Sequence, residues 1–192
     1  GTGADYEERT SVTAVAGASD CTNSEEQAIT ISINDVDEAP SFTSSSTFSV
    51  DENETAIGTV TASDPENDSL TYSISSSDIS IDSSTGVMTF DTAPDYETQT
   101  SYSATVTASD GTNSSTQDIT VSINNLNDNA PSISTLTYDA DELSTNIFGT
   151  LSASDADGDS LSYSIDSSDI SVDASSGFLS FNSEPDYETQ NS

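Results

Sequence analysis

The chain has 192 residues, of which 35 are Asp or Glu and one is basic, so its formal charge is -34 at pH 7. This balance excludes nucleic acids and anionic membranes as natural partners, because both bind proteins through clustered Lys and Arg. With no His and a single Cys, an intrachain disulfide, a thiolate zinc site and Ser-His or Cys-His nucleophilic catalysis are excluded as well.

Like charge at this density favours an expanded chain unless cations neutralise it. Hard cations bound by oxygen are therefore the candidate ligands. No apolar stretch approaches the roughly 20 residues that a membrane helix needs, so direct membrane insertion is not expected. Scarce Lys and Arg beside abundant Ser and Thr suit a secreted or bacterial surface protein.

The sequence repeats itself with a period of about 90 residues. The tripeptide Asp-Tyr-Glu begins at Asp5, Asp95 and Asp186, which are 90 and 91 residues apart. Other blocks recur in step: the segment 29–34 returns at 119–124, and the segment 62–70 returns at 153–161. The repeating unit is therefore the size of one small domain.

Within each period, apolar residues alternate with Ser and Thr, which predicts short half-buried antiparallel strands. Turn residues at 83–86 and 174–177 predict two hairpins. No apolar 3.6-residue period is long enough for a helix. Several short strands with frequent turns in a unit of this size predict an all-β fold of Greek-key β-sandwiches. In chain order, the strands are expected at 70–74, 87–90, 102–108, 119–123, 161–165 and 178–181.

Acidic residues concentrate at the predicted strand ends. Loops gather at the two poles of a sandwich, so these carboxylates would repel one another unless a divalent cation lay among them. Ca²⁺ takes 6 to 8 oxygens from carboxylates, Asn side chains and carbonyls, which matches this set, whereas Mg²⁺ fits poorly. Isolated Asp residues more commonly cap turns, and that is the role expected for Asp78, Asp82, Asp91, Asp166, Asp169 and Asp173.

These motifs, in this order, resemble cadherin repeats in their bacterial cadherin-like form. The segment 50–60 is similar to the family's opening strand with its calcium-binding Glu, here Glu52. Asp155-Ala156-Asp157 resembles the family's Asp-Ala-Asp pair, with 64–66 as a variant, and 95–97 stands where the family has Asp-Arg-Glu. Residues 125–131 resemble the linker between repeats, and 35–40 is a version one residue shorter. The resemblance implies tandem cadherin/immunoglobulin-like sandwiches with Ca²⁺ at the repeat junctions.

The resemblance also implies the metal ligands. At the junction formed by residues 125–131 they are Glu52, Asp95, Glu97, Asn125, Asn127, Asp128, Asn129, Asp155 and Asp157. The corresponding residues of the other repeats are Asp5, Glu7, Asp20, Asp35, Asp37, Glu38, Asp64, Glu66, Asp110 and Glu142.

By the family pattern, residues 41–131 form one complete repeat. Residues 1–40 are then the closing strands of a preceding repeat, and residues 132–192 are the opening strands of a following one. Each fragment exposes unpaired strand edges. We therefore expect residues 1–40 of one molecule to complete residues 132–192 of another by strand exchange, which would bring Asp20 and Glu142 to the metal sites of the partner.

The leading interpretation is a calcium-binding module, without enzymatic activity, of a bacterial surface or secreted protein. Ca²⁺ would stiffen a rod used in cell adhesion, with homophilic self-association. The alternative is a Ca²⁺-dependent carbohydrate-binding module of a secreted polysaccharide-degrading system, although the absence of Trp counts against a sugar platform. A glycosidase with paired carboxylates is not expected, because the carboxylates recur in each repeat.

Overall fold

The computed structural model describes residues 7–134, 136–139, 141 and 148–186. The chain divides into two compact units, Gly1–Asn124 and Asn125–Ser192. Across the described ranges the regular secondary structure consists of β-strands, which confirms the predicted all-β class. Within those ranges no helix is long and apolar enough to span a bilayer.

Unit 1 begins with a long hairpin. Strands β1 (Ser11–Ser19) and β2 (Ser24–Ser32) pair antiparallel along their whole length. Between residues 7 and 134, no further strand joins this two-stranded sheet. In its turn, Cys21 has a φ of 76°, at the position where the next repeat has Gly111 with a φ of 105°.

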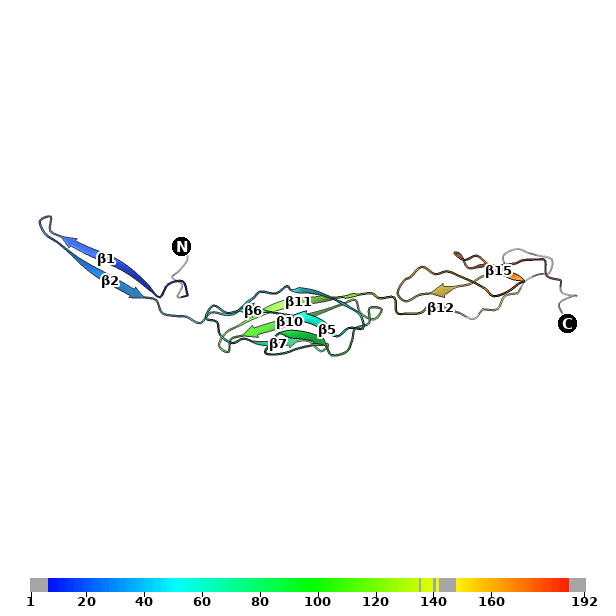
Figure 1. Ribbon diagram of the computed structural model, residues 1–192, viewed down its shortest axis with the longest axis horizontal. Coiled ribbons are helices and arrows are strands. Elements are labelled where there is room, and N and C mark those ends of the chain that lie inside the picture. The colour runs from blue at the N-terminus through cyan, green and yellow to red at the C-terminus, as the bar shows by residue number, and fades with distance from the viewer. Residues whose placement is uncertain (1–6, 135, 140, 142–147, 187–192) are drawn as a thin grey trace. The chain divides into compact units, whose positions relative to one another are not determined.

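The rest of unit 1 is a β-sandwich, called here the central domain (residues 41–124; Figure 1). One sheet has the order β4-β11-β10-β7, the other has the order β5-β9-β8, and β3 pairs with β6. Strand β4 runs parallel to β11, whereas the other pairs are antiparallel. The strands are β3 (Ser41–Phe42), β4 (Thr47–Asp51), β5 (Ala56–Thr59), β6 (Ala62–Ser63), β7 (Thr71–Ser75), β8 (Ile79–Ile81), β9 (Val87–Phe90), β10 (Ser101–Ser109) and β11 (Ser114–Asn124).

The core lies between these two sheets. Val106 and Val121 from one sheet and Met88 from the other are fully buried. Along β11, buried Ile119, Val121 and Ile123 alternate with exposed Thr120, so the predicted alternation is confirmed. Burying each such aliphatic side chain stabilises the fold by about 1.5–3 kcal/mol.

The chain enters the central domain at one end and leaves it at the other. Because β4 is parallel to β11 and Asp51 lies opposite Asn124, the chain leaves the domain at the end where β4 finishes. It enters at the opposite end, through residues 33–40 before β3. We call these the leading end, next to residues 33–40, and the trailing end, next to Asn124.

Unit 2 repeats part of the central domain. Its β12–β14 pair and its β13-β16-β15 sheet correspond, 91 residues earlier, to β3–β6 and to β5-β9-β8. The strands are β12 (Ser132–Ile133), β13 (Gly149–Thr150), β14 (Ala153–Ser154), β15 (Ile170–Val172) and β16 (Phe178–Phe181).

The predicted strand at 161–165 is wrong, since those residues form no strand. Its counterpart, β7, is held by a ladder with β10. The described part of unit 2 has no counterpart of β10, so this segment lacks the partner that would make it a strand.

Of the predicted turn-capping acids, Asp82 and Asp173 are confirmed, one in each repeat. Oδ1 of Asp82 accepts hydrogen bonds from the amides and hydroxyls of Ser84 and Thr85 at 2.8–3.0 Å. Asp173 does the same for Ser175 and Ser176. The hydroxyl donors hold the pKa of both carboxyl groups well below its usual range. Asp78, Asp91 and Asp169 accept hydrogen bonds from nearby Ser side chains, and no such role is seen for Asp166.

Candidate metal centre

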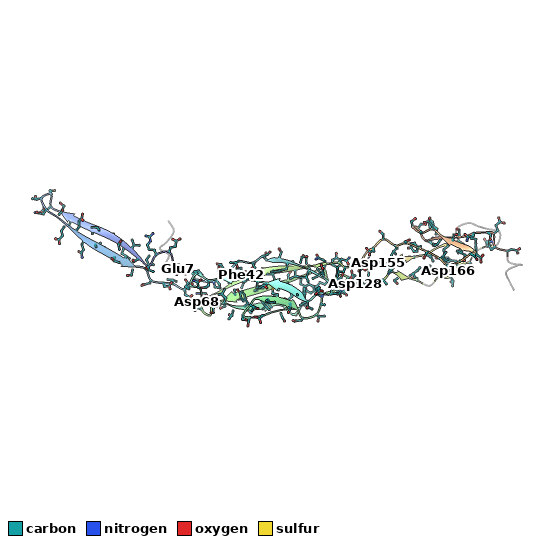
Figure 2. The ribbon with its side chains drawn as sticks, in the orientation of Figure 1. Glu7, Phe42, Asp68, Asp128, Asp155 and Asp166 are labelled. Atoms are coloured by element: carbon teal, nitrogen blue, oxygen red, sulfur yellow. The ribbon has the colours of Figure 1, made fainter. Side chains whose placement is uncertain are left out.

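Three glutamates meet at the leading end of the central domain. Carboxylate oxygens of Glu7, Glu38 and Glu66 lie within 4.8 Å of one another, and Figure 2 shows Glu7 and Asp68 at this end. The turn after β6 positions Glu66, because Oδ1 of Asp64 accepts hydrogen bonds from the amides of Glu66 and Asp68, both at 3.1 Å. These glutamates, which we call the leading cluster, come from three separate segments of the sequence.

Several carboxylate oxygens near the leading end are buried without a hydrogen-bond donor. They are Oδ2 of Asp64, both oxygens of Glu66 and Oδ2 of Asp110. The other oxygen of Asp110 is used, since it accepts from the amides of Thr112 and Asn113 at 2.6 Å. Leaving carboxylate oxygens buried without donors is costly, and a bound cation would satisfy them.

The turn that carries Asp110 contacts the segment that enters the domain. Nδ2 of Asn113 donates a 2.9 Å hydrogen bond to the backbone oxygen of Asp37. Asp110 is therefore held on the same side of the domain as residues 33–40.

Repulsion between the carboxylates of the leading cluster favours the binding of a cation. The nearby Glu38 carboxyl group, together with burial, raises the pKa of Glu66 to about 7. Two carboxylates in contact are stable only if they share a proton or a metal ion.

A second pair of carboxylates lies at the trailing end of the same domain. Glu52 is only 2% exposed, and one of its oxygens lies within 4.8 Å of a carboxylate oxygen of Glu97. The Tyr96 amide donates to Oε2 of Glu52 at 2.8 Å, and the Glu52 amide donates to the backbone oxygen of Asn124 at 3.1 Å. Glu52 is thus fixed beside the last residue of β11.

Asp95 does not lie beside Glu52 as Glu97 does. It caps a turn by accepting from the amides of Glu97 and Thr98 and from the Thr98 hydroxyl, at 2.9–3.3 Å. The Thr98 hydroxyl lowers the pKa of Asp95. The structure brings Glu97, and not Asp95, to Glu52.

Unit 2 carries its own acidic group at the end where it begins. Oxygens of Asp155, Asp157 and Asp159 lie within 4.8 Å of one another, and Asp128 approaches Asp157 to the same limit. Figure 2 shows Asp128 and Asp155 at the same end of this unit. Asp159 was not among the predicted ligands, although an Asp at every second position from 155 to 159 was a readable signal.

The segment 125–129 wraps around this acidic loop. The amide of Asn129 donates to Oδ2 of Asp157 at 2.9 Å, and Nδ2 of Asn125 donates to the backbone oxygen of Asp157 at 2.9 Å. The side chain of Asn127 donates to the Asp159 carboxylate. Of the predicted ligands in this segment, Asn125 and Asn129 therefore contact Asp157, Asp128 lies beside it, and Asn127 contacts Asp159.

The remaining predicted ligands are not seen in a carboxylate group among the described residues. Asp20 is exposed and caps the β1–β2 turn by accepting from the amides of Thr22 and Asn23 at 2.8 and 2.7 Å, which lowers its pKa. Asp35 is exposed and, over the residues described, joins no carboxylate group. Asp5 and Glu142 lie outside the described residues.

All these groups offer only carboxylate, amide and backbone oxygens. That donor set suits Ca²⁺ and not the softer transition metals. The buried, unpartnered oxygens of Asp64, Glu66 and Asp110 fit such an ion, since coordination would compensate their burial.

Comparison with known proteins shows similarity to cadherin domains. Residues 46–124 match the model of the cadherin domain. A cis-dimer structure of protocadherin gammaB7 domains EC3-6 is 25% identical with a TM-score of 0.70, covering 95% of this chain and 54% of that one. Mouse cadherin-23 EC22-24 is 22% identical with a TM-score of 0.73, covering 96% of this chain and 68% of that one. Protocadherin gamma B2 domains 3-6 are 26% identical with a TM-score of 0.67, covering 95% and 53%.

This chain spans about half the length of the two protocadherin structures. A search of curated proteins found no significant match. The comparisons give no support to the carbohydrate-binding alternative. Residues 46–124 are therefore identified as a cadherin domain.

Proposed function

We propose that this chain is a calcium-binding adhesion module of an extracellular protein, without enzymatic activity, and that Ca²⁺ binds at both ends of its central domain. The observation that carries the proposal is the set of buried carboxylate oxygens on Asp64, Glu66 and Asp110 that have no hydrogen-bond donor. Bound divalent cations would neutralise part of a formal charge of -34 and compensate the burial of these oxygens.

The second proposed site would take one half of its ligands from each unit. Unit 1 presents Glu52 and Glu97 beside its last residue, Asn124. Unit 2 begins with residues 125–129, which hold Asp128 beside Asp157. Because these halves are joined directly by the backbone, a cation that took ligands from both would fix the linker. The module would then act as a stiff spacer in a surface protein.

The repeat boundaries belong to the same proposal. We place one complete repeat at 41–131, the closing strands of another at 1–40 and the opening strands of a third at 132–192. The matched cadherin domain, 46–124, falls inside the first of these ranges. Secretion or display on a bacterial surface suits the near absence of Lys and Arg. Self-association is the proposed mode of adhesion, and the related protocadherin gammaB7 structure is described as a cis-dimer.

Thermal unfolding in Ca²⁺, Mg²⁺ and EGTA tests the calcium proposal. Ca²⁺ at 100 times its dissociation constant should stabilise the folded chain by about 2.7 kcal/mol per independent site. Glu66→Gln should remove most of the response at the leading end. Asp118→Asn is the matched control, because Asp118 is an exposed acid of β11 that accepts only from Thr105 in the described contacts. Unfolding curves that superimpose in Ca²⁺ and EGTA would refute the proposal.

A further inference from the structure

Two residue pairs at equivalent positions of the repeat differ in their chemistry. Glu38 and Glu66 stand 91 residues before Asn129 and Asp157, respectively. In each pair the first residue precedes β3 or β12, and the second lies in the acidic loop that follows β6 or β14. One pair therefore consists of two acids, whereas the equivalent pair consists of an amide and an acid.

The pair in unit 2 is joined by direct hydrogen bonds. The backbone amide of Asn129 and its side-chain Nδ2 donate to the two carboxylate oxygens of Asp157, both at 2.9 Å. The side chains of Asn125 and Asn127 donate to the same loop. Residues 125–129, called here the amide linker, are thus attached to the loop of their own unit by bonds that need no cation.

The pair in unit 1 lies in residues 34–38, called here the acidic linker, and in the loop that the linker approaches. Carboxylate oxygens of Glu38 and Glu66 lie within 4.8 Å of each other, and both oxygens of Glu66 are buried without a hydrogen-bond donor. Nδ2 of Asn113 donates to the backbone oxygen of Asp37, which leaves the two glutamate side chains uncompensated.

The difference between the pairs follows from the donors that each side chain carries. An Asn side chain supplies two N–H donors, whereas an ionised carboxylate supplies none. Two ionised carboxylates at short separation repel each other, so a cation between them is needed to hold them together. A hydrogen bond from an amide to a carboxylate is instead stronger than a bond between neutral groups.

From this contrast we propose that Ca²⁺ orders the acidic linker, whereas the amide linker stays attached to unit 2 with or without the ion. The inference rests on the proposed binding of Ca²⁺ at the leading cluster, which contains Glu38 and Glu66. It adds that the two linkers of one chain differ in their dependence on the ion. A cation at Glu52 would still be needed to fix the amide linker to unit 1.

Backbone ¹⁵N relaxation of the full 192-residue chain tests the contrast, because it measures the order of each amide separately. In Ca²⁺ both linkers should have order parameters of about 0.85, the value of a rigid backbone. In EGTA the order parameters of the acidic linker should fall below about 0.6, as in flexible segments. Those of the amide linker should stay at their value in Ca²⁺.

Two substitutions exchange the chemistry of the pairs. Glu38→Asn gives the acidic linker an amide that can donate to Glu66, so this linker should stay ordered in EGTA. Asn129→Glu removes the side-chain donor and places an acid beside Asp157. The amide linker of this variant should therefore lose order in EGTA and regain it in Ca²⁺.

Two control variants change the charge by the same amount without changing the pairs. Asp35→Asn removes one charge from the acidic linker at an exposed residue, and its acidic linker should lose order in EGTA like that of the wild type. Ser132→Glu adds one charge at an exposed residue three positions after Asn129, and its amide linker should stay ordered in EGTA.

Two results would overturn the inference while leaving calcium binding intact. One is equal order of the two linkers of the wild type in EGTA. The other is an acidic linker that Asp35→Asn orders in EGTA as well as Glu38→Asn does, because net charge and not the pair would then be the cause. If Ca²⁺ changes neither the order parameters nor the unfolding curves, the proposed calcium function fails together with the inference.

Discussion

The amide of Tyr96 donates a 2.8 Å hydrogen bond to the carboxylate of Glu52, 44 residues earlier in the chain. This bond joins the end of β4 to the loop before β10 and holds a buried acid beside Glu97. Burying a charged carboxylate next to another acid is costly. A bound cation, as proposed above, would offset this cost.

Replacing Glu52 with Gln should change stability in opposite directions with and without metal. The Gln side-chain oxygen can still accept from the Tyr96 amide, so the fold should be kept. In EGTA the variant should be at least as stable as the wild type, because repulsion with Glu97 is removed. In Ca²⁺ it should be less stable, with an apparent affinity about tenfold lower or more, equivalent to about 1.4 kcal/mol.

Paired thermal unfolding curves in EGTA and Ca²⁺ measure this crossover. Glu54→Gln is the control, since Glu54 is an exposed acid two residues away and should respond to Ca²⁺ like the wild type. Identical shifts for the two variants would rule out a ligand role for Glu52.

The turn acid Asp82 should contribute to stability only at pH values at which it is ionised. Hydrogen bonds from Ser84 and Thr85 lower its pKa below the usual 3.8, so the folded state holds the proton less tightly than the unfolded state. Its contribution is then fully present above the unfolded pKa and is lost as pH falls through the folded pKa. Asp82→Asn should be less stable than the wild type at pH 7, and the difference should shrink in acid.

Urea unfolding of wild type and variant between pH 7 and pH 2 gives this difference directly. Asp166→Asn serves as the control, because no turn-capping role is seen for Asp166. A difference between wild type and Asp82→Asn that does not vary with pH would show that the turn bonds do not depend on the charge of Asp82.

Two glycines with positive φ should respond very differently to alanine. A Cβ on Gly86, which has a φ of 71°, would lie 2.2 Å from the backbone oxygen of Val60, while a Cβ on Gly111 would meet nothing within 4 Å. Gly111→Ala should cost only the backbone strain, of the order of 1–3 kcal/mol, as the Cys at the corresponding position 21 suggests. Gly86→Ala should cost more, because the backbone of Val60 must also move.

Denaturant midpoints of the two alanine variants provide the comparison. The expected order is wild type, then Gly111→Ala, then Gly86→Ala with the lowest midpoint. Equal decreases in the midpoint would mean that the backbone around Val60 moves without loss of stability.

Calcium should also lengthen the molecule in solution. If a cation fixes residues 125–131, small-angle scattering should show a larger maximum dimension in Ca²⁺ than in EGTA. The measurement should be made at low concentration, where copies do not associate. Calcium binding with no change in dimension would separate binding from stiffening and reject only the latter.

Alternation of apolar and hydroxyl side chains was sufficient to predict β10 and β11, because both strands are buried on one face within their own domain. The same alternation at 161–165 predicted a strand that is not formed, since pairing depends on a partner as well as on pattern. The parallel pairing of β4 with β11 could not be predicted from alternation, which carries no information on strand direction.

Prediction of the acidic sites from the sequence was limited in a similar way. The motif at 95–97 predicted two ligands, but only Glu97 lies beside Glu52, while Asp95 turns back to the amides that follow it. A linear motif does not reveal which carboxylate a local turn will use. Asp159 was missed because it lies outside the family's two-residue motif, although the same loop brings it to Asp155 and Asp157.

The parallel ladder between β4 and β11 determines how the central domain carries tension. It runs from Thr47 opposite Thr120 to Asp51 opposite Asn124. A pull on the two ends of the domain draws these strands past each other in opposite directions, so the evenly spaced bonds of the ladder are loaded in shear and must rupture together. A hairpin such as β1–β2, pulled apart at its open end, would instead unzip one pair at a time. Strands β4 and β11 thus form a mechanical clamp, whose resistance adds to whatever a bound cation contributes.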